Sequence, residues 1–324
     1  MEFPENKEER IKLQEGNTYF FICFALVCGG KSTFFEQIIS QTSSEQNKDK
    51  YNIQIVSSDK IREELSLEMQ KKNPNMTFKQ CFDKVGKETA KKFDSQIKAA
   101  INQRKEDKIN IILVDKNYPQ GIGKFLKLFC KDMSSQFFLV FIPTIKKPIV
   151  INNLKFPYSL NYFIQCYLRL KNRHGHEVLN GEDESSKSVY LSFFKLFQNF
   201  DFYKKINSEK QYENNVFLQT IDFTDESKDI EIDKDTENFF ENVIKHMKAF
   251  DMENIKLNYE KDINTYFNSI EEKYDGKGFF ADTRELIKNQ VTDLLENGIK
   301  NFNSEVNFIV GSFYTYEKTK ELLK

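Results

Sequence analysis

The stretch that decides the fold reads Phe20-Phe-Ile-Cys-Phe-Ala-Leu-Val-Cys-Gly-Gly-Lys-Ser-Thr-Phe-Phe-Glu-Gln-Ile-Ile39. It begins with an apolar run typical of a buried strand, passes through a glycine-containing turn, and ends with the apolar spacing of an amphipathic helix. A strand, a turn with Gly-Lys-Ser and a helix, in this order, form the context that a phosphate-binding loop requires. The stretch therefore predicts an α/β domain with a phosphate site between its first strand and its first helix.

Each residue type in this loop suits the binding of phosphate. Glycines let successive backbone N–H groups converge on an anion at the positive end of a helix. Lys31 is placed to bridge the terminal phosphates of a nucleotide, and the Ser32 hydroxyl is placed to complete the shell of a magnesium ion. The residues expected to bind the nucleotide are Cys28, Gly29, Gly30, Lys31, Ser32 and Thr33.

The loop departs from the usual pattern in two places. Ala25 stands where the motif has its first glycine, and the residues before Lys31 read Val27-Cys28-Gly29-Gly30. The alternative interpretation is therefore a vestigial loop that binds no nucleotide, because a bare Gly-Lys-Ser often marks an ordinary solvated turn.

Outward from the loop, apolar runs alternate with longer segments of helical period, which is the signature of an α/β domain. Continuous apolar runs suggest strands covered on both faces, and hence a mostly parallel sheet within a three-layer fold of the P-loop NTPase type. The expected strands are Tyr19–Val27, Tyr51–Ser57, Ile109–Asp115, Gln136–Pro143 and Val216–Phe223. The expected helices between them are Ser32–Ser40, Lys60–Lys72, Phe78–Arg104 and Ile122–Lys131.

The two ends of the chain differ from this core. Residues 1–16 are charged and predict a flexible tail or a short helix, so the α/β domain with the phosphate loop is expected to span residues 17–225. An acidic segment after residue 225 marks a boundary. A helical C-terminal appendage is expected over residues 226–324, as a candidate surface for a protein complex, with helices at Phe239–Ala249, Ile255–Glu272 and Thr283–Asn297.

Composition narrows the class of protein. A net charge of -1 over 324 residues argues against a chain that is basic overall, so contact with nucleic acid would need a local patch. The five cysteines are odd in number, and no pair has the two-residue separation of a zinc site. Reduced thiols in the cytosol or nucleus fit best. The apolar run before the loop is too short to span a bilayer, so no membrane span is expected.

A second polar cluster follows the next predicted strand. Asp59 and Arg62 lie three residues apart where that strand ends and a helix begins, at the edge where open parallel sheets bind ligands. A carboxylate there can accept the proton of an attacking hydroxyl, and an arginine one turn later can clamp a phosphate of the acceptor. The alternative is ordinary capping of the helix by Ser57, Ser58 or Asp59. Beside the phosphate loop, the catalytic interpretation leads.

Two further candidates lie later in the chain. Asp115 ends the strand Ile109–Asp115, where phosphate-loop enzymes keep an acid near the magnesium, so Ser32 and Asp115 are the expected metal ligands. A strand-end turn is the alternative for Asp115. Arg169 and Arg173 are four residues apart and, if helical, share a face from which they could close over the transferring phosphoryl group as a lid. A solvated basic face is the alternative for these arginines.

Several motifs in order extend over Tyr19 to about residue 225: Gly30-Lys-Ser-Thr33, Ser57-Ser-Asp-Lys-Ile-Arg62, Val114-Asp-Lys-Asn117, Arg169-Leu-Lys-Asn-Arg-His-Gly-His176 and Val189-Tyr-Leu-Ser-Phe-Phe194. Together they resemble the kinase domain of plant- and fungal-type tRNA ligases, which is similar to phage polynucleotide kinase. The resemblance implies transfer of the γ-phosphoryl group of ATP or GTP, with Mg²⁺, to the 5′-hydroxyl end of an RNA.

The resemblance also implies a role for each matching residue. Lys31 and Ser32 would hold the donor phosphates and the magnesium ion. Asp59 would be the general base for the 5′-hydroxyl, and Arg62 would bind the 3′-phosphate of the acceptor. The later arginine pair would belong to the lid.

Three functions stay open at this point. The first is the RNA 5′-kinase, for which a basic stripe could face the RNA: Lys84, Lys87, Lys91, Lys92, Lys98, Arg104, Lys105 and Lys108. A solvated helix face is the simpler interpretation of these residues. The second is a catalytically inactive kinase-like subunit that serves as a scaffold in a larger complex. The third is a kinase of a nucleoside or another small molecule, which would share the loop but lack affinity for RNA.

Overall fold

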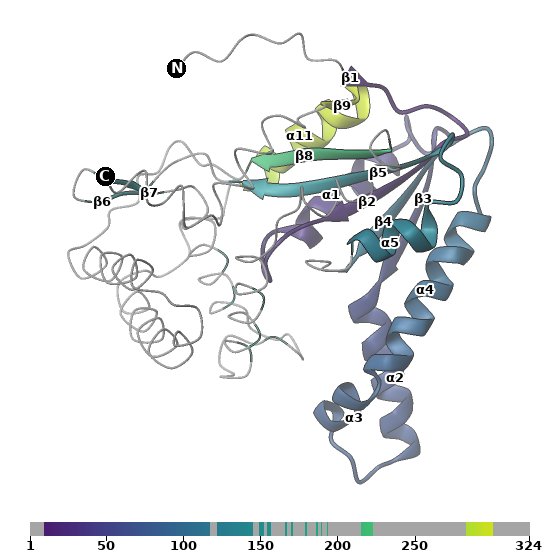
Figure 1. Ribbon diagram of the computed structural model, residues 1–324, viewed down its shortest axis with the longest axis vertical. Coiled ribbons are helices and arrows are strands. Elements are labelled where there is room, and N and C mark those ends of the chain that lie inside the picture. Colours follow the sequence, from purple (N-terminus) through teal and green to yellow (C-terminus); the bar gives the residue numbers. More distant parts are fainter. Residues whose placement is uncertain are drawn as a thin grey trace.

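The computed structural model describes residues 10–116, 122–144, 149–151, 154–156, 215–222 and 283–300, and the single positions 166, 170, 179, 186, 189 and 193. At its centre is an all-parallel sheet of five strands (Figure 1). The strands are β2 (Thr18–Cys23), β3 (Tyr51–Ser57), β4 (Ile109–Asp115), β5 (Gln136–Thr144) and β8 (Val216–Asp222). The sequence prediction of an α/β domain with a mostly parallel sheet is confirmed.

The order of the strands in the sheet is β3-β4-β2-β5-β8. The strand before the loop, β2, therefore lies in the middle, with β4 on one side and β5 on the other. The chain builds the β3 and β4 side first and then crosses to β5 and β8, so the order reverses at β2. Ligands of open parallel sheets bind outside the carboxyl ends of the strands at such a reversal, which is where the loop after β2 lies.

The strand before the loop, β2, ends earlier than the sequence predicts. The expected strand ran to Val27, but β2 ends at Cys23 although residues 24–27 are all buried. The Phe24 N–H still donates to the Phe141 carbonyl at 2.8 Å, and the chain then turns, with the Gly29 N–H donating to the Leu26 carbonyl at 2.9 Å. A buried loop and a buried strand have the same hydrophobicity, so the apolar run alone could not separate them.

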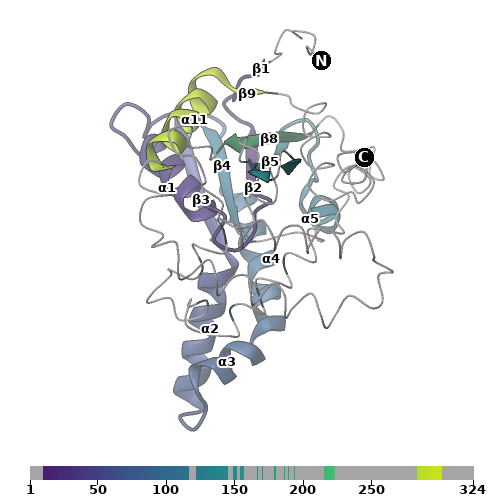
Figure 2. The same ribbon diagram turned by 90° about the vertical axis from the view of Figure 1, so that its left-hand side faces the viewer.

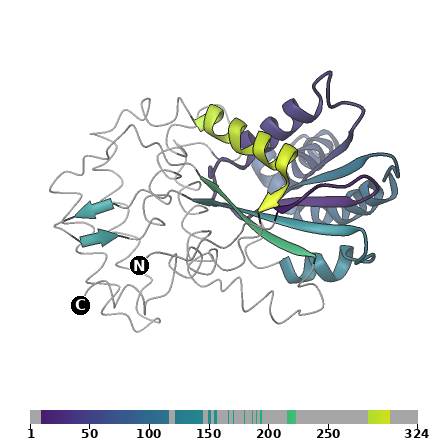
Figure 3. The ribbon, with the colours of Figure 1, turned by 90° about the horizontal axis from the view of Figure 1, so that it is seen from above.

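Helices cover both faces of the sheet and complete three layers. One face carries α1 (Lys31–Thr42) and α11 (Thr283–Asn297), and the other carries α5 (Ile122–Phe129) (Figure 3). The short strands β6 (Ile149–Ile151) and β7 (Leu154–Phe156) form a separate antiparallel pair. None of the described helices is both long enough and apolar enough to cross a membrane.

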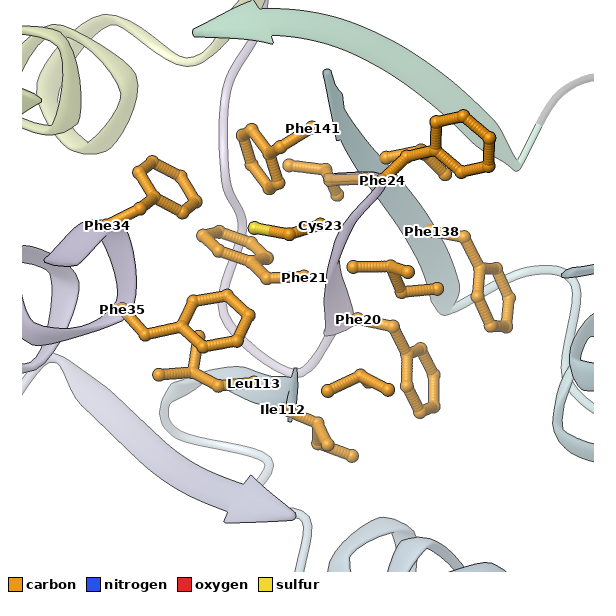
Figure 4. Packing of buried hydrophobic residues seen from close by; sticks show 14 of the residues in the cluster. Phe20, Phe21, Cys23, Phe24, Phe34, Phe35, Ile112, Leu113, Phe138 and Phe141 are labelled. Carbon is orange, nitrogen blue, oxygen red and sulfur yellow. The ribbon is translucent and has the colours of Figure 1, made fainter. Parts of the chain in front are cut away.

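Phenylalanines pack on both faces because successive side chains of a strand point in opposite directions. On the α1 face, Phe34 and Phe21 lie with ring centroids 4.6 and 5.1 Å from Phe141. On the α5 face, Phe20 stacks on Phe138 at 4.6 Å (Figure 4). Burying one such side chain stabilises the fold by about 1.5–3 kcal/mol, so the centre of the sheet is a firm base for the loop that leaves it.

Three helices extend from the sheet as an arm: α2 (Ser58–Lys72), α3 (Phe78–Lys84) and α4 (Gly86–Asn102) (Figures 1 and 2). The sequence predicted one helix over 78–104, and this was wrong. The chain breaks at Val85, whose backbone φ of -80° and ψ of 1° end α3, while its side chain is buried in the core. The apolar spacing continues through the break, so periodicity did not reveal it.

The two ends of the described chain meet. The strand β1 (Arg10–Ile11) pairs antiparallel with β9 (Ile299–Lys300). The expected tail over residues 1–16 therefore contains a strand at 10–11, because residues far along the chain supply its hydrogen-bonding partner. Gly298 makes this approach possible: its φ is +88°, and a Cβ there would lie 2.4 Å from the Ile11 carbonyl oxygen.

The helix α11 lies where the sequence predicts a helix, but it is part of the α/β core. It packs against α1, and Ile287, Val291 and Leu294 are almost fully buried. Gln290 also exchanges two hydrogen bonds of 2.8 Å with the backbone of Asp222 at the end of β8. Residues 283–300 are thus not an appendage, and the other two predicted C-terminal helices lie outside the described residues.

Candidate functional site

The loop between β2 and α1, which the sequence predicts to bind phosphate, has two left-handed backbone positions. Gly30, the residue before α1, has φ 84°, and Cys28 has φ 61°. Glycine adopts this conformation without strain, whereas a cysteine there is strained by about 1–2 kcal/mol. No side chain caps the start of α1, and no acidic residue lies in its first turn. No carboxylate in the first turn of α1 therefore offsets the partial positive charge at the start of this helix.

Lys31 pairs with Asp115 across the edge of the sheet. Lys31 is the first residue of α1, and Asp115 is the last residue of the adjacent strand β4. Their Nζ and Oδ1 atoms form an ion pair, and the side chains are only 15% and 20% exposed. The other carboxylate oxygen, Oδ2, accepts a hydrogen bond of 2.7 Å from the Ser57 hydroxyl at the end of β3. Two strand ends and a helix start thus converge on one carboxylate.

These residues fit a nucleotide and a magnesium ion. The uncapped start of α1 and the Lys31 ammonium suit the phosphates of a nucleotide. Magnesium prefers hard oxygen ligands and usually takes only one or two carboxylates, with phosphates and water completing its shell. Asp115 and the exposed Ser32 have this chemistry. In the described ranges, His, Cys, Asp and Glu side chains nowhere gather in threes as an all-protein metal site.

The start of α2 shows which of Ser57, Ser58 and Asp59 caps this helix. The Ser57 hydroxyl accepts the Lys60 N–H at 3.4 Å and is the cap of this helix, with backbone φ of -108° and ψ of 119°. The interpretation as a cap is therefore confirmed for Ser57. Asp59 lies in the first turn and is exposed at the carboxyl edge of the sheet. A carboxylate there is open to a hydroxyl that arrives from solvent.

Arg62 is held by the neighbouring helix of the arm. Its Nε donates to the Phe82 carbonyl at 2.9 Å, and its guanidinium carbon lies 3.8 Å from the centroid of the Phe82 ring. Burial lowers the pKa of Arg62, an effect that the nearby Asp83 and Asp59 oppose. These contacts use Nε and one face of the guanidinium group. They therefore fix the direction in which its remaining N–H groups point.

Lys116 is a residue of this edge that the sequence interpretation left without a role. It is the first residue after β4. Its Nζ lies 4.6 Å from the centroid of the Phe93 ring on α4. Burial lowers the pKa of Lys116 and the Lys124 charge lowers it further, whereas Asp94 and Asp59 oppose this shift. Its position directly after the strand-end acid Asp115 is the sequence signal that could have identified it.

Other predicted residues stay predictions. Arg169, Arg173 and Asn117 lie outside the described residues, so the structure does not test the lid. Five of the eight residues of the basic stripe are exposed, whereas Lys92, Arg104 and Lys108 are half-buried. Some members have acidic partners. Lys92 lies 3.2 Å from Glu64, and Arg104 lies 3.0 Å from Glu106. Salt-bridged surface residues are what a solvated face also predicts.

The comparisons with known proteins are sparse. No protein-family model and no curated protein matches the chain. Among the solved structures that match is one described as "Crystal Structure of Fungal RNA Kinase". It is 15% identical, with a TM-score of 0.35, over 87% of this chain and 99% of that chain. The chain therefore has a distant structural similarity to that kinase, and a likeness at this level carries no conclusion about activity.

Proposed function

We propose that this chain is a nucleotide-dependent phosphotransferase that phosphorylates the 5′-hydroxyl end of an RNA. The observation that carries the proposal is the convergence of Lys31, Asp115 and Ser57 at the uncapped start of α1. Asp59 stands at the start of the next helix on the same edge of the sheet. A phosphate donor and a hydroxyl acceptor could thus meet between the two helix starts.

The donor side would hold the phosphates of ATP or GTP. Phosphoryl transfer is catalysed mainly by positioning and by neutralisation of charge. The Lys31 ammonium and the start of α1, which carries about half a positive charge, supply such neutralisation. The Asp115 carboxylate keeps the Lys31 ammonium at the loop, and with Ser32 it would hold a magnesium ion. Such an ion would offset the negative charge of the phosphates.

The acceptor side would be organised by Asp59 and Arg62. Asp59 would accept the proton of the attacking hydroxyl, which raises the nucleophilicity of the oxygen. As this oxygen bonds to the γ-phosphorus, the bond from that phosphorus to the β–γ bridging oxygen breaks, and the nucleoside diphosphate leaves. Arg62, one turn later on α2, would bind a phosphate of the acceptor. A guanidinium group suits phosphate because its planar fork donates two parallel hydrogen bonds. The choice of RNA rests on the order of the sequence motifs, which matches polynucleotide kinases of the tRNA ligase type.

Phosphate transfer from labelled ATP and GTP to a short RNA with a 5′-hydroxyl tests the proposal. The reaction contains magnesium, and Lys31→Ala serves as the blank. We expect label on the 5′ end with the native chain and none with the variant. An RNA that already carries a 5′-phosphate is the matched acceptor control and should stay unlabelled. Absence of transfer with the native chain from either nucleotide would contradict the proposal.

The backbone at Cys28 favours a second candidate, an inactive kinase-like subunit. A non-glycine residue at φ 61° and Ala25 in place of the first glycine both depart from an active loop. Such a subunit would bind ATP or GTP without turnover and would co-purify in a fixed complex. Nucleotide affinity by calorimetry, measured beside the transfer assay, separates the two: binding with no transfer to any acceptor favours the scaffold.

A small-molecule kinase would use the same donor loop and the same Asp59. The acceptor distinguishes this function from the RNA kinase, because the rate of a nucleoside kinase does not rise when the acceptor has more nucleotides. Equal rates for a nucleoside and for an RNA of about ten nucleotides would favour this third function. A rate that rises with chain length, and that falls steeply with salt, favours RNA.

A further inference from the structure

An ion pair joins the two residues that are expected to hold the charged ligands of the loop between β2 and α1. Lys31 is the candidate for the phosphates of the nucleotide, and Asp115 is a candidate ligand of the magnesium ion. The structure pairs the Lys31 Nζ with the Asp115 Oδ1, and the two side chains are only 15% and 20% exposed. A pair that is largely removed from water is screened less by solvent and salt than a surface pair. Each residue therefore holds the other against the ligand that it is expected to bind.

The Asp115 carboxylate has a partner on both of its oxygens. Its Oδ2 accepts the hydrogen bond of 2.7 Å from the Ser57 hydroxyl. Ser57 is itself buried, and it lies opposite Asp115 in the register of β3 and β4. The Oδ1 atom, which pairs with Lys31, is shielded from solvent. A second cation can therefore reach Oδ1 only when Lys31 moves away from it.

Moving Lys31 alone is unfavourable. A largely buried carboxylate that loses its partner is left with an uncompensated charge, which strongly destabilises the site. A phosphate group brings only negative charge, so it takes Lys31 from Asp115 and adds repulsion to the carboxylate. A phosphate group that arrives with a divalent cation also brings a positive partner that suits a carboxylate. The ion pair thus opposes metal-free phosphate more than it opposes the complex with the cation.

We propose that the Lys31–Asp115 ion pair is an autoinhibitory contact that makes nucleotide binding depend on a divalent cation. The inference rests on the proposed function and deepens it, because it concerns the regulation of the same loop. When a nucleotide binds together with the cation, Lys31 exchanges Asp115 for the phosphates, and Asp115 exchanges Lys31 for the cation. Metal-free nucleotide leaves the pair closed.

Calorimetric affinities for two forms of ATP test the contact without catalysis. One titration contains magnesium, and the other contains EDTA, so that the ATP is metal-free. The native chain should bind the magnesium form at least about tenfold more tightly, since a hydrogen bond between charged groups contributes about this factor. Asp115→Asn keeps the shape of the side chain and releases Lys31, so it should tighten the binding of metal-free ATP about tenfold. An unchanged affinity for metal-free ATP in this variant would overturn the proposal.

A second substitution separates competition for Lys31 from simple repulsion between Asp115 and the phosphates. Lys31→Met should weaken the binding of metal-free ATP about tenfold more in the Asp115→Asn background than in the native chain, because only there is Lys31 released for the phosphates. Equal factors in the two backgrounds would show that the two charges act independently, which would refute the contact.

Lys31→Met also decides the question on its own if Asp115→Asn does not fold. It should weaken the binding of magnesium-bound ATP about tenfold more than that of metal-free ATP, because Lys31 reaches the phosphates only in the magnesium form. Equal losses for the two forms would contradict the proposal.

Two controls lie before β3, at the amino ends of the strands. Lys50 has its Nζ 5.3 Å from the centroid of the Tyr51 ring, and Lys48 forms an exposed ion pair of 3.0 Å with Glu45. Lys50→Gln removes a positive charge there, and Glu45→Gln releases a lysine from a carboxylate, as Asp115→Asn does. Both variants should bind each form of ATP as the native chain does. A gain in metal-free affinity equal to that of Asp115→Asn would show a general effect of charge and overturn the contact.

The transfer assay distinguishes failure of this inference from failure of the proposed function. Affinities that depend on magnesium and on the two variants as described, with no transfer to RNA, would contradict the proposed function and support the contact. Transfer to RNA, with equal affinities for the two forms of ATP, would support the proposed function and overturn the contact. Failure of both forms to bind would contradict both.

Discussion

The starts of α1 and α2 lie at the same edge of the sheet, yet they are built in opposite ways. The start of α1 has a left-handed glycine, no capping side chain and no acid in its first turn. The start of α2 has an extended serine that caps the helix, and Asp59 follows in its first turn. The start of α1 has no cap from a side chain, whereas the start of α2 is capped by Ser57 and presents the carboxylate of Asp59.

The difference indicates which ligand each helix start can receive. A helix start with no side-chain cap and with a lysine is stabilised by a bound phosphate, because the phosphate oxygens accept hydrogen bonds from backbone N–H groups there. A capped start with an acid repels phosphate but can accept a proton. Ser57 joins the two, since its hydroxyl caps α2 and also donates to Asp115, the partner of Lys31. Hydrogen bonds of the Ser57 hydroxyl therefore connect the two helix starts.

The largest effect should come from removing the charged residue of each helix start. Lys31→Ala and Asp59→Asn should each lower turnover by about 1000-fold or more, because one removes the charge proposed to neutralise the phosphates and the other removes the proposed base. Only Lys31→Ala should also weaken ATP binding, as measured by calorimetry. An equal loss of nucleotide affinity in both variants would contradict the proposed difference between the starts of α1 and α2. Lys50→Gln is the charge control for both measurements.

Gly30 tests whether the left-handed start of α1 is needed. Gly30→Ala places a Cβ at φ 84°, which costs about 1–2 kcal/mol and distorts the loop. Thermal unfolding and ATP affinity should both decline. Gly86, the first residue of α4, is the control, since a Cβ there meets nothing within 4 Å. Gly86→Ala should leave ATP affinity unchanged and keep or raise stability.

Ser57 tests the link between the two starts. Ser57→Ala removes a helix cap, which destabilises the protein by about 0.5–2 kcal/mol, and it also removes the hydrogen bond to Asp115. We expect a several-fold rise in the KM for ATP. Thr77→Ala is matched to it, because Thr77 caps α3 in a capping box remote from the loop. That variant should show a similar loss in urea unfolding without a change in KM.

Thiol labelling should show the smallest effect. Cys28 is partly exposed in the loop, whereas Cys23 is buried beneath it. Burial raises the pKa of Cys23 to about 12, against an opposing effect of Lys31. Because the thiolate is the reactive form, iodoacetamide should modify Cys28 at pH 8 and spare Cys23. ATP with magnesium should slow the reaction of Cys28 by a few fold. Equal labelling with and without ATP would contradict a nucleotide at the loop.

Much of this architecture could be predicted from the sequence, because buried parallel strands are continuous apolar runs. The bounds of β3 and β4 agree with the predicted ranges, and α11 lies where a helix was expected. Periodicity shows which face of a helix is apolar, but it does not name the partner of that face. For this reason the packing of α11 on α1 and the pairing of β1 with β9 could not be predicted.

The residue types of the candidate site could be predicted from the sequence, but the contacts between these residues were harder to predict. Lys31, Asp59 and Asp115 belong to recognisable strand-end motifs. The role of Ser57 as a shared partner depends on the register between β3 and β4, where Ser57 pairs with Asp115. The placement of Lys116 over Phe93 depends on how the arm folds back along the sheet. Both facts join residues that are far apart in the chain, and local patterns carry no information about them.

The late position of α11 also affects the synthesis of the protein. Ile287, Val291 and Leu294 cover α1, but they emerge from the ribosome roughly 240 residues after it. At about 5–20 residues per second, the apolar outer face of α1 waits for about 12–50 seconds. Throughout this interval, the face of the sheet that carries α1 lacks the cover that α11 provides. This face is where we expect a chaperone to bind the growing chain.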